Sequence, residues 1–144
     1  MIKLYSKGCE HILRIISQVP REECDRSFLA KNLCCRSKVP EYSARKGLQL
    51  LVQKKVLEAI PGPGGGYRFA VPPKKIPLLD VITAIDGKDP LKRCIMGLPD
   101  CGSKNPCPMH NTWRDLKEKL LREFKNKTLF DLMSAPSNKR ESLI

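Results

Sequence analysis

The chain has 144 residues and a formal net charge of +12, and 41% of its residues are hydrophobic. This length suits one compact domain with its own core and is too short for two full catalytic domains. No stretch approaches the ~20 consecutive apolar residues of a membrane span, and the first residues lack the apolar segment of a secretory signal. We therefore expect a soluble, cytoplasmic protein. The excess positive charge lies toward both ends of the chain and favours DNA as a partner.

Hydrophobic residues at helical spacing predict three helices in the first part of the chain. The first covers about residues 6–19, and the second is a short helix that begins after a cap at Asp25 or Ser27. A basic turn over residues 36–39 leads to a third helix over about residues 40–55, with a proline at its first position. Two short helices joined by a tight turn are the components of a helix-turn-helix.

Two short strands, residues 56–60 and 67–71, are predicted after the third helix. The sequence PGPGGG, residues 61–66, lies between them. Its glycines permit positive φ angles and close backbone approach, and its prolines stiffen the turn. Taken singly, these features also suit a plain hairpin loop or a generic helical bundle. In this order they indicate a wing, so the predicted fold class is mainly α with a small β-hairpin: a winged helix-turn-helix followed by a long C-terminal dimerisation helix.

In such a fold the third helix enters the major groove of DNA with its N-terminal residues nearest the bases. The candidate DNA-contacting residues in and before this helix are Ser37, Lys38, Glu41, Tyr42, Arg45, Lys46 and Gln49. In the wing, glycines allow the backbone to approach DNA phosphates, and a nearby arginine supplies positive charge. The candidate DNA-contacting residues there are Gly64, Gly65, Gly66 and Arg68. Each basic residue could equally belong to a solvated helix face.

The seven cysteines include a cluster that suggests metal chemistry. Four are scattered through the first quarter of the chain: Cys9, Cys24, Cys34 and Cys35. The others form the pattern Cys94-x6-Cys101-x5-Cys107-x2-His110. Three thiolates and an imidazole suit a soft metal or an iron–sulfur cluster. Structural zinc usually joins cysteines separated by about two to four residues. The longer gaps favour a cluster, with zinc or reactive metal-free thiols as the alternatives.

A short helix over residues 78–85 is expected before this cysteine loop, and a longer one from Thr112 to about Asn126 after it. The longer helix carries an apolar stripe, Trp113, Leu116, Leu120 and Phe124. Such a stripe is either core or, beside a small winged domain, a dimer interface, and we expect a homodimer. The expected organisation is a winged helix-turn-helix in residues 1–76, connecting helix, cysteine loop and dimerisation helix in residues 77–133, and a disordered tail in residues 134–144.

Four stretches of the sequence resemble the Rrf-two-type winged-helix regulators of bacteria. They are LYSKG at residues 4–8, VPEYSARKGLQLLVQKKVLEAIPGPGGGY through the third helix and wing, DVITAIDG at residues 80–87, and CPMHNTWRDL at residues 107–116. The resemblance extends over about residues 1–133. This family includes a regulator of iron–sulfur cluster assembly, a nitric-oxide-sensing repressor and a rhizobial iron regulator.

The resemblance implies homodimers that bind roughly palindromic operators, with a 2Fe–2S or 4Fe–4S cluster near the dimer interface. Cys94, Cys101 and Cys107 fall on the family's three cysteine ligands, and His110 falls on the histidine ligand of the assembly regulator. Cys9 falls where the nitric-oxide sensor has an aspartate ligand from the opposite subunit. Both Cys9 and His110 are therefore candidate fourth ligands.

Two departures from the assembly regulator limit what the resemblance implies. The spacing between the first two cysteines is one residue longer, so the cluster type is not carried over. Pro61 stands where that regulator has an arginine, so insertion of an arginine into the minor groove at this position is in doubt.

The predicted function is a DNA-binding transcriptional regulator that senses iron, redox or nitric oxide state through an iron–sulfur cluster. The alternative is a cluster-free winged-helix regulator controlled by zinc, thiols or a protein partner. An enzyme is not expected, because the chain has only two histidines, no nucleotide-binding loop and no evident pair of carboxylates in a pocket.

Overall fold

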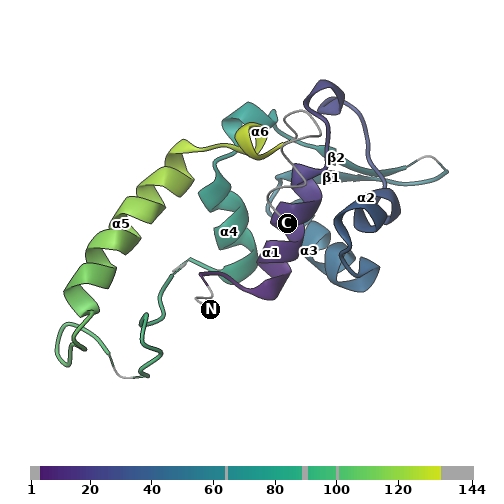
Figure 1. The fold of residues 1–144 in the computed structure, drawn as a ribbon. Helices are drawn as coiled ribbons and strands as arrows, with labels where there is room; N and C mark the ends of the chain where they lie inside the picture. The colour runs from purple at the N-terminus through teal and green to yellow at the C-terminus, as the bar shows by residue number, and fades with distance from the viewer. Residues whose placement is uncertain (1–3, 64, 89–90, 100, 134–144) are drawn as a thin grey trace.

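The computed structural model describes residues 4–63, 65–88, 91–99 and 101–133 (Figure 1). Within them the elements, in chain order, are α1 (Lys7–Ser17), the short 3-10 helix η1 (Arg21–Glu23), α2 (Ala30–Ser37), α3 (Glu41–Gln53), β1 (Leu57–Ile60), β2 (Gly66–Phe69), the 3-10 helix η2 (Pro73–Lys75), α4 (Leu78–Asp86), α5 (His110–Asn126) and α6 (Leu129–Leu132). This order confirms the predicted fold class, a mainly helical protein with one β-hairpin. The disordered tail expected at residues 134–144 lies outside the described residues.

The start of α2 differs from the prediction. The helix begins at Ala30 and has no side-chain cap, so the expected caps at Asp25 and Ser27 are wrong. The reason is that Phe28 pairs with Tyr67 of the wing in an isolated antiparallel bridge, which holds the chain before α2 out of a helix. Its N–H donates to the carbonyl of Tyr67 at 2.8 Å, and the N–H of Tyr67 donates back at 2.9 Å.

The turn between α2 and α3 is tighter than expected. Helix α2 continues to Ser37, and Lys38 takes a left-handed conformation with φ of 57°. Pro40 precedes α3 as its N-cap residue instead of occupying its first position. The chain therefore reverses within about three residues, which places α2 against α3 as a helix-turn-helix.

The wing is an antiparallel hairpin in which Leu57 pairs with Phe69 and Ile60 with Gly66. Gly66 has a φ of 143°, and a Cβ atom there would lie 2.3 Å from the carbonyl oxygen of Phe28. No side chain fits so close to backbone, which explains glycine at this position.

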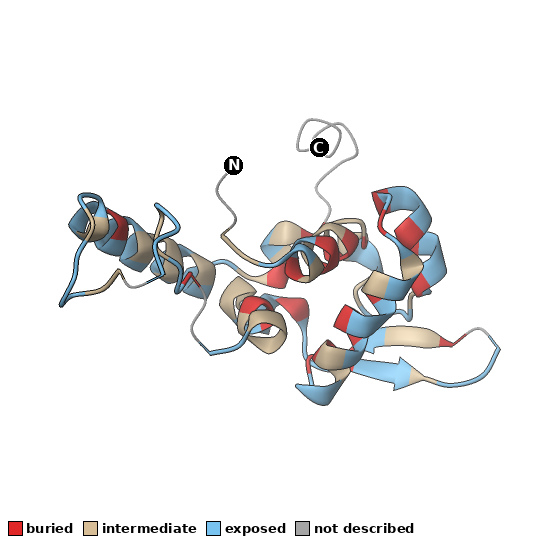
Figure 2. Cartoon of the chain, turned by 90° about the horizontal axis from the view of Figure 1, so that it is seen from below, coloured by how far each residue is buried: buried red, intermediate tan, exposed pale blue. Residues whose placement is uncertain are grey.

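One hydrophobic core joins the first three helices to the later ones. Its fully buried members include Ile12, Ile15 and Ile16 of α1, Leu48 and Leu51 of α3, Val81 of α4, Leu129 of α6, and Met133. Figure 2 shows the buried residues concentrated in this part of the molecule, whereas α5 is mostly half-buried or exposed. The core therefore extends across the division expected at residue 76.

Helix α5 runs away from this core and is attached to it at its C-terminal end (Figure 1). The N–H of Leu78 donates to the carbonyl of Lys127 at 2.8 Å, and the N–H of Leu129 donates to that of Ile76 at 2.9 Å. Arg21 then donates from Nε to the carbonyls of Phe130 at 3.1 Å and Met133 at 3.2 Å. These bonds fix α6 and the end of α5 to the winged domain.

None of the helices in the described residues has the length and apolar character that crossing a membrane requires.

The close packing of α3 on α1 yields a first prediction. A Cβ atom on Gly47 of α3 would lie 2.4 Å from Cγ1 of Ile12, a fully buried side chain. Overpacking of this kind costs about 1–3 kcal/mol, while alanine is favoured over glycine in a helix by about 1 kcal/mol. We expect Gly47→Ala to lower the free energy of unfolding, measured by urea denaturation.

Gly8 of α1 provides the matched control. A Cβ atom there has only one neighbour, the Oγ of Ser6 at 3.8 Å. Gly8→Ala should therefore leave the stability unchanged or raise it by up to about 1 kcal/mol. Equal effects of the two substitutions would contradict the close approach of α1 and α3.

Candidate metal centre and nucleic-acid interface

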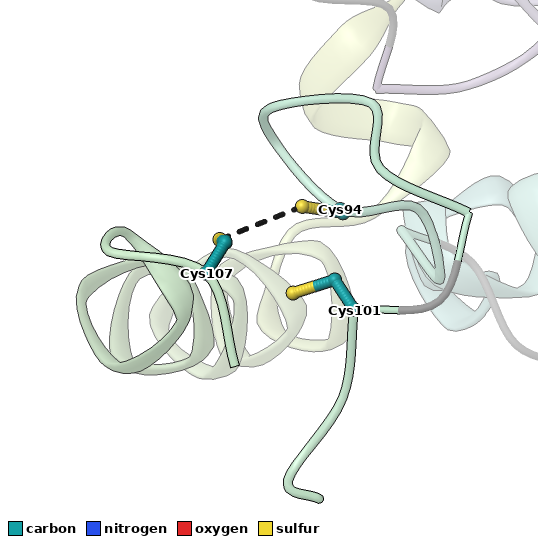
Figure 3. A group of neighbouring side chains, drawn as sticks. All are labelled: Cys94, Cys101 and Cys107. Atoms are coloured by element: carbon teal, nitrogen blue, oxygen red, sulfur yellow. Dashed lines mark hydrogen bonds between the residues drawn. The ribbon is translucent and has the colours of Figure 1, made fainter. Parts of the chain in front are cut away.

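Three cysteine sulfurs gather at the far end of α5. The Sγ atoms of Cys94, Cys101 and Cys107 all lie within 4.8 Å of one another, and Cys94 Sγ is 3.6 Å from Cys107 Sγ (Figure 3). All three side chains are partly buried. Within the described residues this is the group of three His, Cys, Asp or Glu side chains that could hold a metal ion. The predicted ligands separated by six and five residues are thus brought together in space.

His110 lies beside this group. It is the first residue of α5, and its Nδ1 is 3.5 Å from the Sγ of Cys101. Its backbone N–H donates to the carbonyl of Cys107 at 3.0 Å, so the start of α5 is tied to the last cysteine. Four potential ligands therefore come from one loop and the first turn of one helix.

The loop is held on α5 by a contact that the sequence pattern did not reveal. The indole Nε1 of Trp113 donates to the carbonyl of Arg93, next to Cys94, at 2.9 Å. A turn follows, in which Gly97 has a φ of 77° and donates its N–H to the carbonyl of Cys94 at 2.9 Å. The apolar spacing of Trp113 indicated only a helix face, because a bond to a backbone carbonyl across a loop leaves no mark in the sequence.

The surroundings of the thiols favour ionisation of one of them. Hydrogen bonds from the backbone N–H of Leu98 and then Met96, together with the neighbouring thiols, lower the pKa of Cys94 to about 7 despite partial desolvation. The pKa of Cys101 is raised, because desolvation and the nearby sulfurs of Cys107 and Cys94 outweigh the hydrogen bond from the backbone of Cys107. One thiolate and its protonated neighbours are a favourable starting point for metal binding, which requires deprotonated sulfur.

Cys9 lies elsewhere. It is a residue of α1 with no exposed surface. Burial, followed by the negative charge of Asp86, raises its pKa to about 12. Within the single chain this thiol is shielded from solvent and does not ionise readily.

Helix α3 presents most of the predicted DNA-contacting residues. Tyr42 is 83% exposed, and Arg45, Lys46 and Gln49 are exposed on the same helix. Lys38 is exposed in the turn before it.

Ser37 is a correction to the predicted DNA-contacting set. It is only 2% exposed, because its hydroxyl donates to the carbonyl of Leu33 at 2.6 Å inside α2.

Two of the predicted arginines are paired with carboxylates. Arg45 Nη2 lies 2.6 Å from Oε1 of Glu41, one turn earlier on α3, and Arg68 Nη2 lies 2.7 Å from Oε2 of Glu58 on the neighbouring strand. All four side chains are substantially exposed, so these are weak ion pairs that can open to water or phosphate. Glu41 therefore partly compensates the positive charge of Arg45 on the exposed side of α3.

Close backbone contacts explain why glycine occupies positions 65 and 66 of the wing, and the sequence pattern did not reveal these contacts. A Cβ atom on Gly65 would lie 2.1 Å from the carbonyl oxygen of Ile60, and Gly66 is equally confined by Phe28. Gly65 is also buried, so approach to DNA does not explain it. Gly64 lies outside the described residues. In the turn of the wing, Pro61, Gly62 and Pro63 are exposed.

The predicted dimerisation stripe divides into two parts. Trp113 is 9% exposed and packs within the chain. Leu116 is 48% exposed, and Leu120 and Phe124 are half-buried on the same helix. An apolar surface thus remains along α5.

Comparison with known proteins identifies the family. The sequence matches the Rrf2 family, described as an iron-dependent transcriptional regulator, over residues 5–135. The chain belongs to the Rrf2 family. It is therefore a transcriptional regulator and not an enzyme, and its family implies DNA binding. This confirms the resemblance to the Rrf-two-type regulators.

This Rrf2 protein is similar in sequence to IscR regulators and in fold to both CymR and IscR. It is 33% identical over 110 residues to the HTH-type transcriptional regulator IscR of Vibrio vulnificus, a match that covers 69% of this chain and 65% of that relative. Its fold is similar to CymR, the global cysteine regulator of B. subtilis, with a TM-score of 0.68, 19% identity, and coverage of 92% of this chain and 96% of CymR. The T. potens IscR structure has a TM-score of 0.66 at 17% identity and covers 99% of this chain and 92% of its own.

The Glu41–Arg45 pair yields a prediction for DNA binding. Glu41→Gln frees the guanidinium of Arg45 to neutralise a phosphate and removes a carboxylate from the DNA-facing helix. We expect tighter binding to duplex DNA and a steeper dependence of log affinity on log salt, by about 0.9 per protomer. Fluorescence anisotropy at several salt concentrations measures both.

The matched control is Glu10→Gln, which opens an ion pair with the same spacing between Glu10 and Arg14 of α1. It adds the same charge to the protein away from α3. The idea fails if both substitutions change the salt dependence equally.

Proposed function

We propose that this Rrf2 protein is a homodimeric DNA-binding regulator whose operator affinity depends on an iron–sulfur cluster held by Cys94, Cys101 and Cys107. The observation that carries the proposal is the gathering of the three Sγ atoms within 4.8 Å of one another. Three sulfurs converging from an irregular loop are the donor set that iron–sulfur clusters use. The family's description as iron-dependent adds support.

His110 is the fourth ligand in this proposal. Its Nδ1 already lies 3.5 Å from the Sγ of Cys101, and its side chain is half-buried beside the loop. Cys9, the other candidate, is fully buried in α1 with a pKa raised to about 12. Ligation by Cys9 would require the first turn of α1 to open, whereas His110 already lies beside one of the three cysteine sulfurs.

Dimerisation through α5 accounts for its exposed apolar residues. Leu116 is 48% exposed, and Met109 at the start of the helix is 38% exposed. A second copy packed along this helix would cover them, and a two-fold regulator needs such an interface to place two recognition helices in half-sites about 34–36 Å apart. The cysteine loop, bonded to α5 through Trp113, would then lie at this interface.

The bound cluster would supply a centre whose ligation and charge change with iron supply, oxidants or nitric oxide. The protein's own contribution is the attachment of the loop to α5. The hydrogen bonds from Trp113 to Arg93 and from His110 to Cys107 tie both ends of the loop to the first turn of the helix. A change in loop conformation would therefore shift α5, and in a dimer it would alter the distance between the two recognition helices.

The visible spectrum of the anaerobically purified full chain, with iron, sulfide and zinc assayed together, tests this proposal. We expect charge-transfer bands with matched iron and sulfide, and their shape distinguishes a 2Fe–2S from a 4Fe–4S cluster. A colourless protein with stoichiometric zinc, or with no metal after attempted reconstitution, would instead support control by zinc or thiols.

Two single substitutions then test the fourth ligand. His110→Ala should change the spectrum and speed the loss of iron to a chelator, because one ligand is replaced by solvent. Cys9→Ala should leave both unchanged. The reverse result would assign the fourth ligand to Cys9, as in the arrangement that the sequence resemblance left open.

The proposed interface yields a separate prediction. Leu116→Asp places a charge on the exposed apolar surface of α5 and should convert a dimer to a monomer in analytical ultracentrifugation. Arg122→Asp is the control, because residue 122 lies on the opposite side of the helix and is exposed. A dimer that survives Leu116→Asp would place the interface elsewhere.

A further inference from the structure

The root of the cysteine loop is fastened to the first turn of α1. Asp86, the last residue of α4, accepts hydrogen bonds from both the backbone N–H and the hydroxyl of Ser6, the former at 2.8 Å. Ser6 is the N-cap of α1, and its Oγ in turn accepts from the N–H of Cys9 at 3.1 Å. We call this three-residue arrangement the Asp86 clasp.

The placement of Asp86 is unfavourable within its own helix. A carboxylate at a helix C-terminus faces the negative end of the helix dipole. Here the same carboxylate lies at the N-terminus of α1, where the dipole is positive and free N–H groups are available. The favourable interaction of the Asp86 carboxylate with the α1 dipole therefore offsets its unfavourable interaction with the α4 dipole. This balance depends on α1 and α4 keeping their relative position.

The clasp lies between the sensor loop and the DNA-binding helix. The chain leaves α4 directly after Asp86, at Gly87, whose φ is 96°. On the other side α1 is joined to α3 by the contact of Gly47 with Ile12 and by a hydrogen bond of 2.8 Å between Nδ1 of His11 and the hydroxyl of Ser43. His11 is only 8% exposed, so this bond is sheltered from water.

We propose that the Asp86 clasp transmits movement of the cysteine loop to the recognition helix within one chain. Displacement of the loop root moves Asp86, the first turn of α1 loosens, and the position of α3 on α1 changes through His11 and Gly47. The role of the loop as sensor rests on the proposed function, whereas the mechanical link between the clasp and α3 is a property of the metal-free chain.

Cys9 provides a direct probe of the clasp. It is buried, and its N–H is bonded to Ser6, so its thiol reacts only when the first turn of α1 opens. In the metal-free full chain we expect Asp86→Ala to speed alkylation of Cys9 by iodoacetamide about tenfold or more, followed by mass spectrometry of the peptide that contains it. Asp86→Asn, which keeps one acceptor oxygen, should give an intermediate rate and guards against a misfolded alanine variant.

The second measurement is DNA affinity in the same metal-free proteins. Asp86→Ala should weaken binding to duplex DNA severalfold, although Asp86 belongs to α4 and its side chain is bonded to Ser6 and not to α3. Asp80→Ala is the matched control, because it removes an exposed carboxylate from the same helix. Within the described residues the Asp80 side chain forms no hydrogen bond or ion pair, so this substitution should change neither the alkylation rate nor the affinity.

The outcomes separate this inference from the proposed function. If Asp86→Ala behaves like Asp80→Ala in either measurement, the clasp does not link the loop root to α3 and the inference is overturned, whatever the cluster does. If both measurements change as expected but the anaerobically purified protein shows no cluster in its visible spectrum, the clasp stands and the iron–sulfur proposal falls.

Discussion

The packing of α1 against α3 is the contact on which the rest of the structure depends. Gly47 allows the two helices to approach so closely that Ile12 fills the place of a side chain. Every other part that matters for function is positioned from this pair. Asp86 joins α4 to the start of α1, and Arg21, just after α1, holds α6 and thereby the end of α5. Helix α3 is thus fixed to an element that is bonded to the end of α4 and to α6, and α3 also packs directly on α4.

The positive charge on α3 and the wing is lower than the net charge of +12 suggests. Arg45 and Arg68 each have a carboxylate partner within their own element or hairpin, so their positive charge is partly compensated before DNA arrives. A phosphate has to displace Glu41 or Glu58 to use them. Such pairs lower the affinity for any phosphate backbone. The loss of affinity is smaller at a DNA site where base contacts or groove shape compensate for it.

The sequence predicted those features that repeat or lie close in the chain. Helical spacing located α1, α3 and α5, and the glycines and prolines located the wing. It could not predict what depends on contacts between distant segments. The pairing of Phe28 with Tyr67 delays the start of α2, the bond from Ser37 to Leu33 removes a predicted DNA contact, and burial of Cys9 separates it from the other cysteines. The three clustered cysteines were predictable as a group because their residue type is itself the signal.

The position of the cysteine loop constrains how any signal can reach DNA. The loop lies at the end of α5 that points away from the winged domain, so its state cannot act on α3 of the same chain by direct contact (Figure 1). Two hydrogen-bonded connections remain within the chain, the root of the loop at Asp86 and the end of α5 at Ile76 and Leu129, beside the packing of α5 on α4. The connection at α6 is anchored by two fully buried side chains, Leu129 and Met133. It therefore serves as a fixed pivot, which leaves the exposed bonds at Asp86 as the connection within one chain that a moving loop can alter.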